Sequence, residues 1–170
     1  EVDFKFHSQR DSLKKTYVYY IYNYPIRNPL ARLYSWWVPE KLDLSAMKSC
    51  LPLIIGTRDF ASFRKSGTDI KTTIRTIYDA KFKRVPGRKH MIAFEITGRG
   101  FMRYMVRNLV GALVEVGKGN LTVEDFKKIL EARDRKVAPP PAPPQGLVLK
   151  KIEYPKIKII DSYPKFKVEL

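Results

Sequence analysis

An apolar repeat of fifteen residues most limits what this chain can fold into. From residue 102 to residue 116, apolar side chains recur every three or four positions, and Gly117 and Gly119 end the pattern. This period is typical of a helix with one buried face. Such a helix needs an apolar layer to pack against, and several other segments of the chain are patterned as strands.

Runs of aromatic and β-branched residues indicate the strands of that layer. They cover residues 16–24, 33–38, 72–82, 90–97 and 147–154. Pro86 and Gly87 predict a turn between the third and fourth runs, which we therefore expect to pair as an antiparallel hairpin. Residues 60–69 are polar and basic and contain glycine, so we interpret them as a loop.

Two further helices and a rigid connector complete the pattern. Asp43 is a predicted N-cap, and Pro52 is predicted to interrupt the helix that Asp43 starts. Thr122 is the predicted N-cap of a helix over residues 121–133. Five prolines within residues 138–144 indicate a polyproline connector. Without strand–helix–strand alternation or internal repeats, these elements predict an α+β fold, a mainly antiparallel sheet with helices packed on one face.

The charge of the chain indicates a polyanionic partner. It has 33 Lys and Arg residues against 17 Asp and Glu, which gives a net charge of +16 and a pI near 9.9. A nucleic acid is the expected partner, and the sheet face without helices is where we expect RNA to bind. The single cysteine, Cys50, excludes an internal disulfide and a cysteine-based metal cluster and favours a cytoplasmic location. The apolar runs are too short for a membrane span, so we expect no membrane partner.

Basic and aromatic residues are the candidates for contacts with the phosphates and bases of a nucleic acid. The first strand carries five tyrosines, and aromatic side chains on a sheet commonly stack unpaired bases. Arg99 precedes the long helix, and Arg103 and Arg107 are spaced one turn apart on its predicted polar side. The candidate phosphate contacts in and after the polar loop are Arg64, Lys65, Lys71 and Arg75. A solvated surface is the alternative interpretation of these charges.

Three segments of the chain resemble TruA-type tRNA pseudouridine synthases and occur in that family's order. They are Lys15-Thr16-Tyr17-Val18-Tyr19, residues 56–63 (GTRDFASF) and residues 101–111 (FMRYMVRNLVG). Shorter matches at residues 71–75, 115–117, 130–135 and 142–147 extend the resemblance over residues 6–155. The resemblance implies the ferredoxin-like half of a pseudouridine synthase and an isomerase activity.

The resemblance also implies roles for two residues. In the family, the arginine of the Met-Val-Arg-Asn segment is set against the catalytic aspartate, and that position is Arg107 here. The first tyrosine of the Lys-x-Tyr-x-Tyr segment packs against the target uracil, and that position is Tyr17. The family's nucleophilic aspartate lies in an Arg-Thr-Asp-x-Gly-Val-His segment that this chain does not contain. We therefore expect the chain alone to be inactive, and we interpret Asp59, which matches a different loop, as structural.

The resemblance further implies a substrate and a domain organisation. Family members isomerise uridine in the anticodon stem-loop, at tRNA positions 38 to 40, as homodimers and without a metal or other cofactor. We accordingly interpret residues 1–15 as a linker from an N-terminal catalytic domain. Residues 16–155 would be the C-terminal synthase domain, and residues 156–170 a basic tail.

Two alternatives remain open. A non-catalytic RNA-binding domain would account for the charge and the aromatic residues, but it would not require Arg107 and Tyr17 to meet. A scaffold domain that binds an acidic protein would account for the charge alone. A pocket shared by Arg107 and Tyr17 would favour the synthase.

Overall fold

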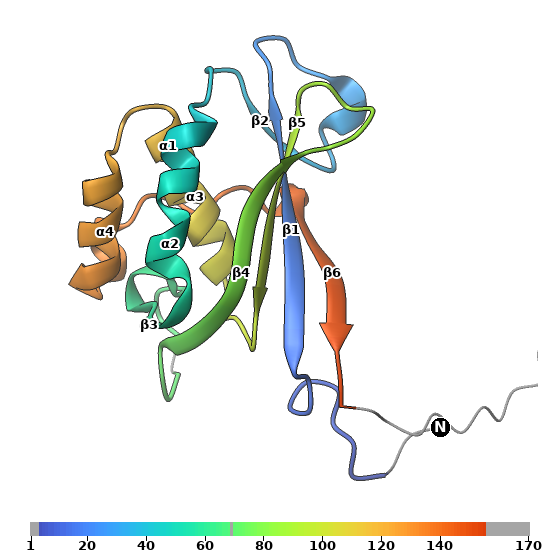
Figure 1. Cartoon of the computed structure of the whole chain (residues 1–170), viewed down its shortest axis with the longest axis vertical. Helices are drawn as coiled ribbons and strands as arrows, with labels where there is room; N and C mark the ends of the chain where they lie inside the picture. Colours follow the sequence, from blue (N-terminus) through green and yellow to red (C-terminus); the bar gives the residue numbers. More distant parts are fainter. Residues whose placement is uncertain (1–3, 69, 156–170) are drawn as a thin grey trace, which may run out of the picture.

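The computed structural model describes residues 4–68 and 70–155, which form one six-stranded sheet with helices on one face (Figure 1). The strands are β1 Lys14–Asn23, β2 Trp36–Val38, β3 Gly56–Asp59, β4 Ile74–Arg84, β5 Met91–Gly98 and β6 Leu147–Glu153. The α-helices are α1 Leu44–Ser49, α2 Leu51–Ile54, α3 Met105–Gly117 and α4 Val123–Ala132. This arrangement confirms the predicted α+β class.

Strand β1 organises the sheet. From Lys15 to Tyr22 it pairs antiparallel with β5, and β5 pairs antiparallel with β4 in the predicted hairpin. On its other side, β2 runs parallel to residues 21–23 and β6 runs antiparallel to residues 14–19. Two strands therefore share one edge of β1 (Figure 1). Because β1 starts at Lys14, the end of the predicted linker over residues 1–15 belongs to the sheet.

The sequence pattern does not indicate strand β3. Thr57, Arg58 and Asp59 show no apolar alternation, yet they pair antiparallel with the first residues of β4. The strand forms because β4 offers a free edge with unpaired backbone groups. The loop predicted over residues 60–69 also contains a short 3-10 helix, η2 Ala61–Phe63, and it buries the rings of Phe60 and Phe63 completely.

Capping residues set the helix ends. The Asp43 carboxylate accepts hydrogen bonds from the backbone N–H groups of Ser45 and Ala46, at 2.8 and 3.0 Å. The helix that starts there ends at Ser49 and a second begins at Leu51, which confirms the predicted interruption. Thr122 and Asp125 form a reciprocal capping box at the start of α4.

Helix α3 begins later than predicted. The apolar repeat predicts a helix from residue 102, but α3 starts at Met105, and Tyr104 before it has a left-handed backbone with φ of 68°. Met102 is buried nevertheless, because a turn directs it into the core. Periodicity reports which side chains are buried and not which backbone conformation buries them. Arg103 therefore lies in that turn, and the prediction that it sits one helical turn from Arg107 is wrong.

The proline-rich connector crosses α3, passes beside β1 and then leads into strand β6. It has no helix or strand between residues 138 and 143, as predicted. Gly111 permits the crossing, since a Cβ atom there would lie 2.3 Å from the carbonyl oxygen of Pro140. Gly146 permits the 3-10 turn η4 Pro144–Gly146 to lie against Tyr19, whose ring would be 2.7 Å from an added Cβ atom.

The remaining predictions concern the basic tail, membrane-spanning helices and metal sites. The predicted basic tail over residues 156–170 lies outside the described residues. Within residues 4–68 and 70–155, the helices lack the length and apolar content that crossing a membrane requires. In the same part of the chain, His, Cys, Asp and Glu side chains do not gather in groups of three or more that could hold a metal ion.

Candidate active site at the start of helix α3

Tyr17 and Arg107 line one cavity. It has a volume of about 360 Å³ and lies where the start of α3 meets β1 and the end of the proline-rich connector. Its walls are formed by Tyr17, residues 101–107, Pro144 and Leu147. Two residues that are far apart in the sequence therefore meet, as the synthase interpretation requires.

The alternation of β1 directs Tyr17 toward the helical face of the sheet. Tyr19 and Ile21, which share its face of the strand, are fully buried in the core. Tyr17 is half-buried, and its ring makes an edge-to-face contact with Phe101 with the ring centroids 5.3 Å apart. This contact fixes the ring at the wall of the cavity.

The cavity therefore lies on the helical face and not on the open face, where we expected RNA to bind. The open face carries Glu95, which pairs across the sheet with Val18. Its carboxylate lies 2.8 Å from the Lys150 ammonium and 3.6 Å from that of Lys83. These ion pairs neutralise part of the positive charge of that face. Tyr17 and Arg107 lie together instead on the helical face, where the start of α3 is next to β1.

Arg107 is oriented by the proline-rich connector. Its Nε donates a hydrogen bond to the carbonyl oxygen of Ala142 at 2.6 Å, and its own carbonyl oxygen accepts one from the Ala142 N–H at 3.0 Å. The guanidinium carbon lies 4.5 Å from the centroid of the Tyr104 ring. Among the described residues no acidic group pairs with Arg107, so the outer nitrogens of the guanidinium remain available to an anion.

Tyr104 brings three cations together. The Lys65 ammonium lies 5.6 Å and the Arg103 guanidinium 5.9 Å from the centroid of its ring, besides Arg107. The Lys65 N–H also donates to the Arg103 carbonyl oxygen at 3.1 Å. Three like charges around one ring repel one another, and an anion such as a phosphate would relieve this repulsion. The sequence gives no signal for Tyr104, because a left-handed non-glycine residue leaves no pattern in the sequence.

Asn108 attaches the polar loop to α3. Its buried amide donates to the carbonyl oxygens of Phe63 and Arg64 at 2.6 and 3.1 Å, and its side-chain oxygen accepts from Arg135 at 3.2 Å. Arg135 also donates to the carbonyl oxygens of Ala138 and Pro139, and burial lowers the pKa of its guanidinium. These two residues fix the loop and the connector to the same helix. In the sequence, Asn108 and Arg135 stand out only as members of segments that match the family.

Tyr19 anchors the other end of the connector. Its hydroxyl donates to the carbonyl oxygen of Pro143 at 2.6 Å, next to the cavity residue Pro144. Burial raises the pKa of this phenol, while the charge of Arg107 acts in the opposite direction. The neutral hydroxyl is the form that can donate this bond.

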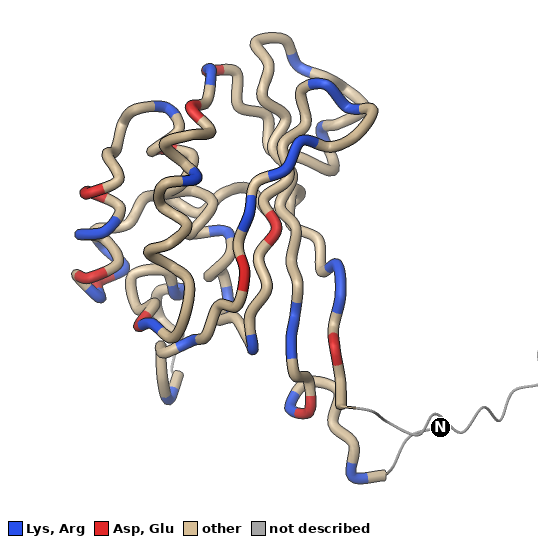
Figure 2. Tube along the Cα trace, in the orientation of Figure 1, with Lys and Arg blue, Asp and Glu red and all other residues tan. Residues whose placement is uncertain are grey.

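The predicted site residues fall into two groups. Tyr17, Arg103 and Arg107 line the cavity, and Lys65 joins them through Tyr104. The structure places Arg64, Lys71, Arg75 and Arg99 away from the cavity wall. Arg75, for example, donates to the nearby carbonyl oxygens of Thr72 and Ile74. Figure 2 shows that basic residues also gather in the hairpin between β4 and β5, which sequence analysis did not select.

Asp59 has the contacts of a structural residue. One oxygen of its carboxylate accepts from the Ala61 N–H at 3.0 Å and from the Thr73 hydroxyl at 2.5 Å. The other lies 3.6 Å from the Nε of Arg133. These contacts hold the segment after β3 against β4 and α4, as the structural interpretation of Asp59 anticipated.

The family model and the known proteins that this chain resembles have the same description. A family model described as tRNA pseudouridine synthase matches residues 52–155, well over half of the chain. A protein named tRNA pseudouridine synthase A from Pseudothermotoga lettingae is 42% identical over 154 residues. Proteins of the same name from Thermotoga maritima and Neisseria gonorrhoeae are 41% and 38% identical over 152 and 150 residues.

The matches cover most of this chain but only part of each relative. The aligned regions include 91%, 89% and 88% of the chain for these three relatives, and 62%, 61% and 56% of the relatives' own lengths. The chain therefore spans about six-tenths of the length of the proteins that it is similar to.

Proposed function

This chain belongs to the family of TruA-type tRNA pseudouridine synthases, and we propose that it supplies the tRNA-binding half of such an enzyme's active site. The observation that carries this proposal is the meeting of Tyr17 and Arg107 in one cavity. The names of the relatives point to tRNA as substrate, and the net charge of +16 suits that polyanion. The proposed product is pseudouridine in the anticodon stem-loop, at positions 38 to 40.

In the proposed reaction, the target uridine leaves its stack, because its reacting atoms are inaccessible within a stacked helix. The uracil enters the cavity and lies against the ring of Tyr17. The bond between C1′ and N1 breaks, the uracil rotates, and a bond between C1′ and C5 replaces it. C5 loses a proton and N1 gains one, so the isomerisation is balanced without an oxidant. The Tyr17 hydroxyl is proposed to assist the removal of the C5 proton.

Arg107 is proposed to hold the nucleophilic aspartate. The bond from Nε to Ala142 orients the guanidinium so that its outer nitrogens can pair with a carboxylate. A nearby cation favours the ionised carboxylate, which is the nucleophilic form. Because the sequence contains no Arg-Thr-Asp-x-Gly-Val-His segment, we propose that this aspartate belongs to an N-terminal domain outside this chain.

The remaining parts of the proposal concern organisation. The segment before strand β1 links the two domains, the chain from β1 to residue 155 forms the C-terminal domain, and the enzyme acts in the cytoplasm as a homodimer. Lys65 and Arg103, which flank Tyr104, contact phosphates next to the target uridine. Arg64, Lys71, Arg75 and Arg99 form an outer footprint for the tRNA backbone.

The direct test is pseudouridine formation on unmodified tRNA. The full 170-residue chain is assayed alone and with an added N-terminal domain that carries the aspartate segment. We expect activity only in the mixture. Activity of the chain alone would contradict the assignment of the nucleophile to another domain. Binding of tRNA without activity in the mixture would favour a non-catalytic RNA-binding domain, and absence of binding would favour a scaffold for an acidic protein.

Substitution of Arg107 tests the role of the cavity. In the complemented enzyme we expect Arg107→Met to lower turnover by at least about a thousandfold, because the carboxylate loses its partner, and to leave tRNA affinity within about threefold. Lys128→Met removes one charge from the exposed face of α4 and is the matched control. Near-normal turnover of Arg107→Met would remove Arg107 from the mechanism.

A further inference from the structure

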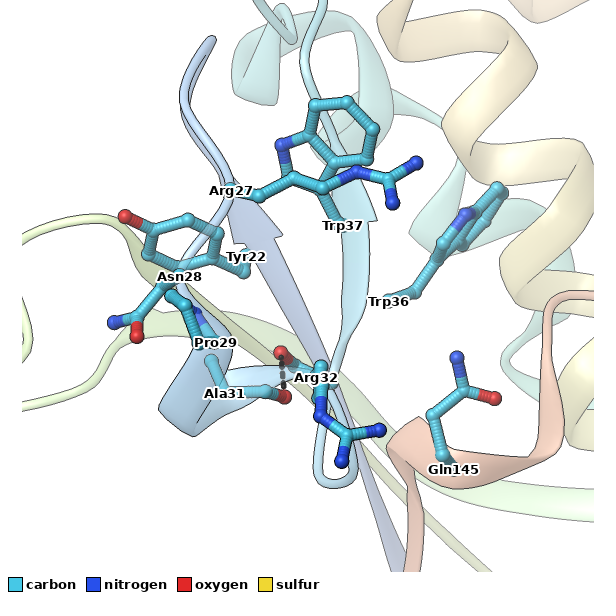
Figure 3. Close-up of a pocket in the computed structure, with 10 residues that line it drawn as sticks. Tyr22, Arg27, Asn28, Pro29, Ala31, Arg32, Trp36, Trp37 and Gln145 are labelled. Carbon is cyan, nitrogen blue, oxygen red and sulfur yellow. Dashed lines mark hydrogen bonds between the residues drawn. The ribbon is translucent and has the colours of Figure 1, made fainter.

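A second cavity lies across the turn η4 from the candidate active site. It has a volume of about 410 Å³, within the range of about 300–1,000 Å³ that is usual for small-ligand sites. The end of β1, the 3-10 helix η1 Pro29–Ala31, strand β2 and Gln145 surround it (Figure 3). The synthase mechanism proposed above does not use it.

The walls of this cavity combine flat aromatic rings with guanidinium groups. Trp36, Trp37 and Tyr22 contribute the rings. The Arg27 guanidinium lies 4.2 Å from the centroid of the Trp37 ring, and the indole N–H of Trp37 donates to the Tyr24 carbonyl oxygen at 2.9 Å. These contacts fix Trp37 before any ligand arrives.

The other side of the cavity presents polar groups. Figure 3 shows the Arg32 guanidinium extending toward Gln145, while the indole of Trp36 points away from them and toward the side of the Arg27 guanidinium. Trp36 is half-buried, whereas Arg32 and Gln145 are exposed. An amide carries both hydrogen-bond donors and an acceptor, so it can pair with the edge of a base.

The charge of the cavity selects an anionic ligand. Within the described residues its charged lining groups are Arg27 and Arg32, and no carboxylate lines it. A cationic ligand is therefore disfavoured. Aromatic rings, arginines and an amide together suit a planar base that carries a phosphate.

The two cavities share a wall. Pro144 lines the candidate active site and Gln145, the next residue, lines the second cavity. Contact between Gly146 and the Tyr19 ring holds the turn that carries both residues. The two cavities therefore border the same turn of the chain, η4.

We propose that this second cavity binds an unpaired base that neighbours the target uridine in the substrate RNA. The base stacks on a tryptophan ring, Arg27 or Arg32 pairs with its phosphate, and Gln145 contacts its edge. This inference rests on the proposed function, because it takes the RNA to be the one whose uridine enters the first cavity.

The chain provides its own reporter for this site. Trp36 and Trp37 are its two tryptophans, and both line the second cavity. Selective excitation of tryptophan in the full chain therefore observes this cavity and not the one that holds Tyr17. We expect a short oligouridylate and a short oligoadenylate to quench this fluorescence with the same midpoint as their binding, which is measured separately by anisotropy of the labelled strand.

Two variants and a control locate the binding. Trp36→Ala, followed through Trp37, should weaken binding by about tenfold, as expected for loss of one stacked base. Arg32→Ala changes an exposed side chain, so it should preserve folding and weaken binding by about threefold to tenfold. Lys128→Ala removes the same charge from α4 and should change binding by less than twofold.

The outcomes separate the two proposals. Binding by anisotropy without tryptophan quenching, or equal effects of Arg32→Ala and Lys128→Ala, would overturn the second site and leave the synthase proposal intact. Absence of RNA binding, together with absence of pseudouridine in the complemented assay, would overturn both. Quenching that Arg32→Ala weakens and Lys128→Ala does not would establish the site.

Discussion

At the scale of single residues, Glu95 shows how the open face of the sheet is stabilised. Its side chain is 15% exposed and lies within 4.0 Å of the ammonium groups of Lys81, Lys83 and Lys150. The hydrogen bond from Lys150 is the largest cause that holds the pKa of this carboxyl below its usual value of 4.5, and the three lysine charges act in the same direction. The ionised form is therefore favoured in the folded chain.

This shift predicts a dependence of stability on pH. A carboxyl whose pKa is lowered by folding contributes stability above its unfolded pKa, and the contribution is lost as the pH falls through the folded pKa. We expect Glu95→Gln to lower the unfolding free energy by about 0.5–1 kcal/mol near neutral pH, since the lysines are half-exposed. In urea titrations, this difference should vanish at acidic pH. A difference that persists there would mean that packing, and not charge, is responsible.

At the scale of elements, the crossing of α3 by the proline-rich connector positions the candidate active site. The connector reaches Arg107 through Ala142 and the cavity wall through Pro144. It can pass this close because Gly111 has no side chain. A helix normally loses about 1 kcal/mol when glycine replaces alanine. Gly111 therefore makes α3 less stable as a helix, but it allows the connector to lie close to α3.

Replacement of Gly111 by alanine tests this arrangement. An added Cβ atom would lie 2.3 Å from the Pro140 oxygen, so the connector must shift. We expect Gly111→Ala to destabilise the chain by about 1–3 kcal/mol despite the better helix propensity of alanine. Gly100→Ala is the control, because no atom lies within 4 Å of the added Cβ atom, and it should change stability by less than about 0.5 kcal/mol. Equal unfolding midpoints of the two variants would show that the connector yields without cost.

At the scale of the whole molecule, excess positive charge and the arrangement of the cavities act together. In the proposed complex, the net charge of +16 would attract RNA over the whole surface, but charge alone does not choose a base. Under our two proposals, the choice of base would depend on the two cavities on either side of η4, where aromatic rings lie beside arginines. RNA affinity and base selection would then depend on different parts of the chain.

Salt should separate these contributions. Lys65, Arg103 and one of Arg27 and Arg32 are proposed to contact three phosphates at the two cavities. Release of counterions from these three phosphates alone would weaken binding by roughly twentyfold between about 50 and 200 mM salt, and the outer footprint would add to this loss. Filter binding of tRNA over this range measures the slope. The Arg32→Ala variant should show a smaller slope than the unchanged chain. Affinity that does not depend on salt would contradict phosphate contacts at these residues.

Local patterns in the sequence were enough to predict most helices and strands and to select Tyr17 and Arg107. Apolar periods of two and of three to four residues record which side chains are buried, and so they indicate the hairpin of β4 and β5 and the helices. Asp43 and Thr122 mark helix starts because capping involves only near neighbours. Segment matches to the family selected Tyr17 and Arg107, which the structure brings to one cavity.

Other features depend on contacts between segments that are distant in the sequence. Strand β3 forms because β4 has a free edge, and Tyr104 adopts its left-handed backbone where the chain turns into α3. The candidate site lies on the helical face because the connector crosses α3 and ends beside β1. The second cavity requires Trp36 and Gln145 to meet across more than half of the chain. Local sequence patterns do not predict such contacts, because the contacts depend on how separated segments pack against each other.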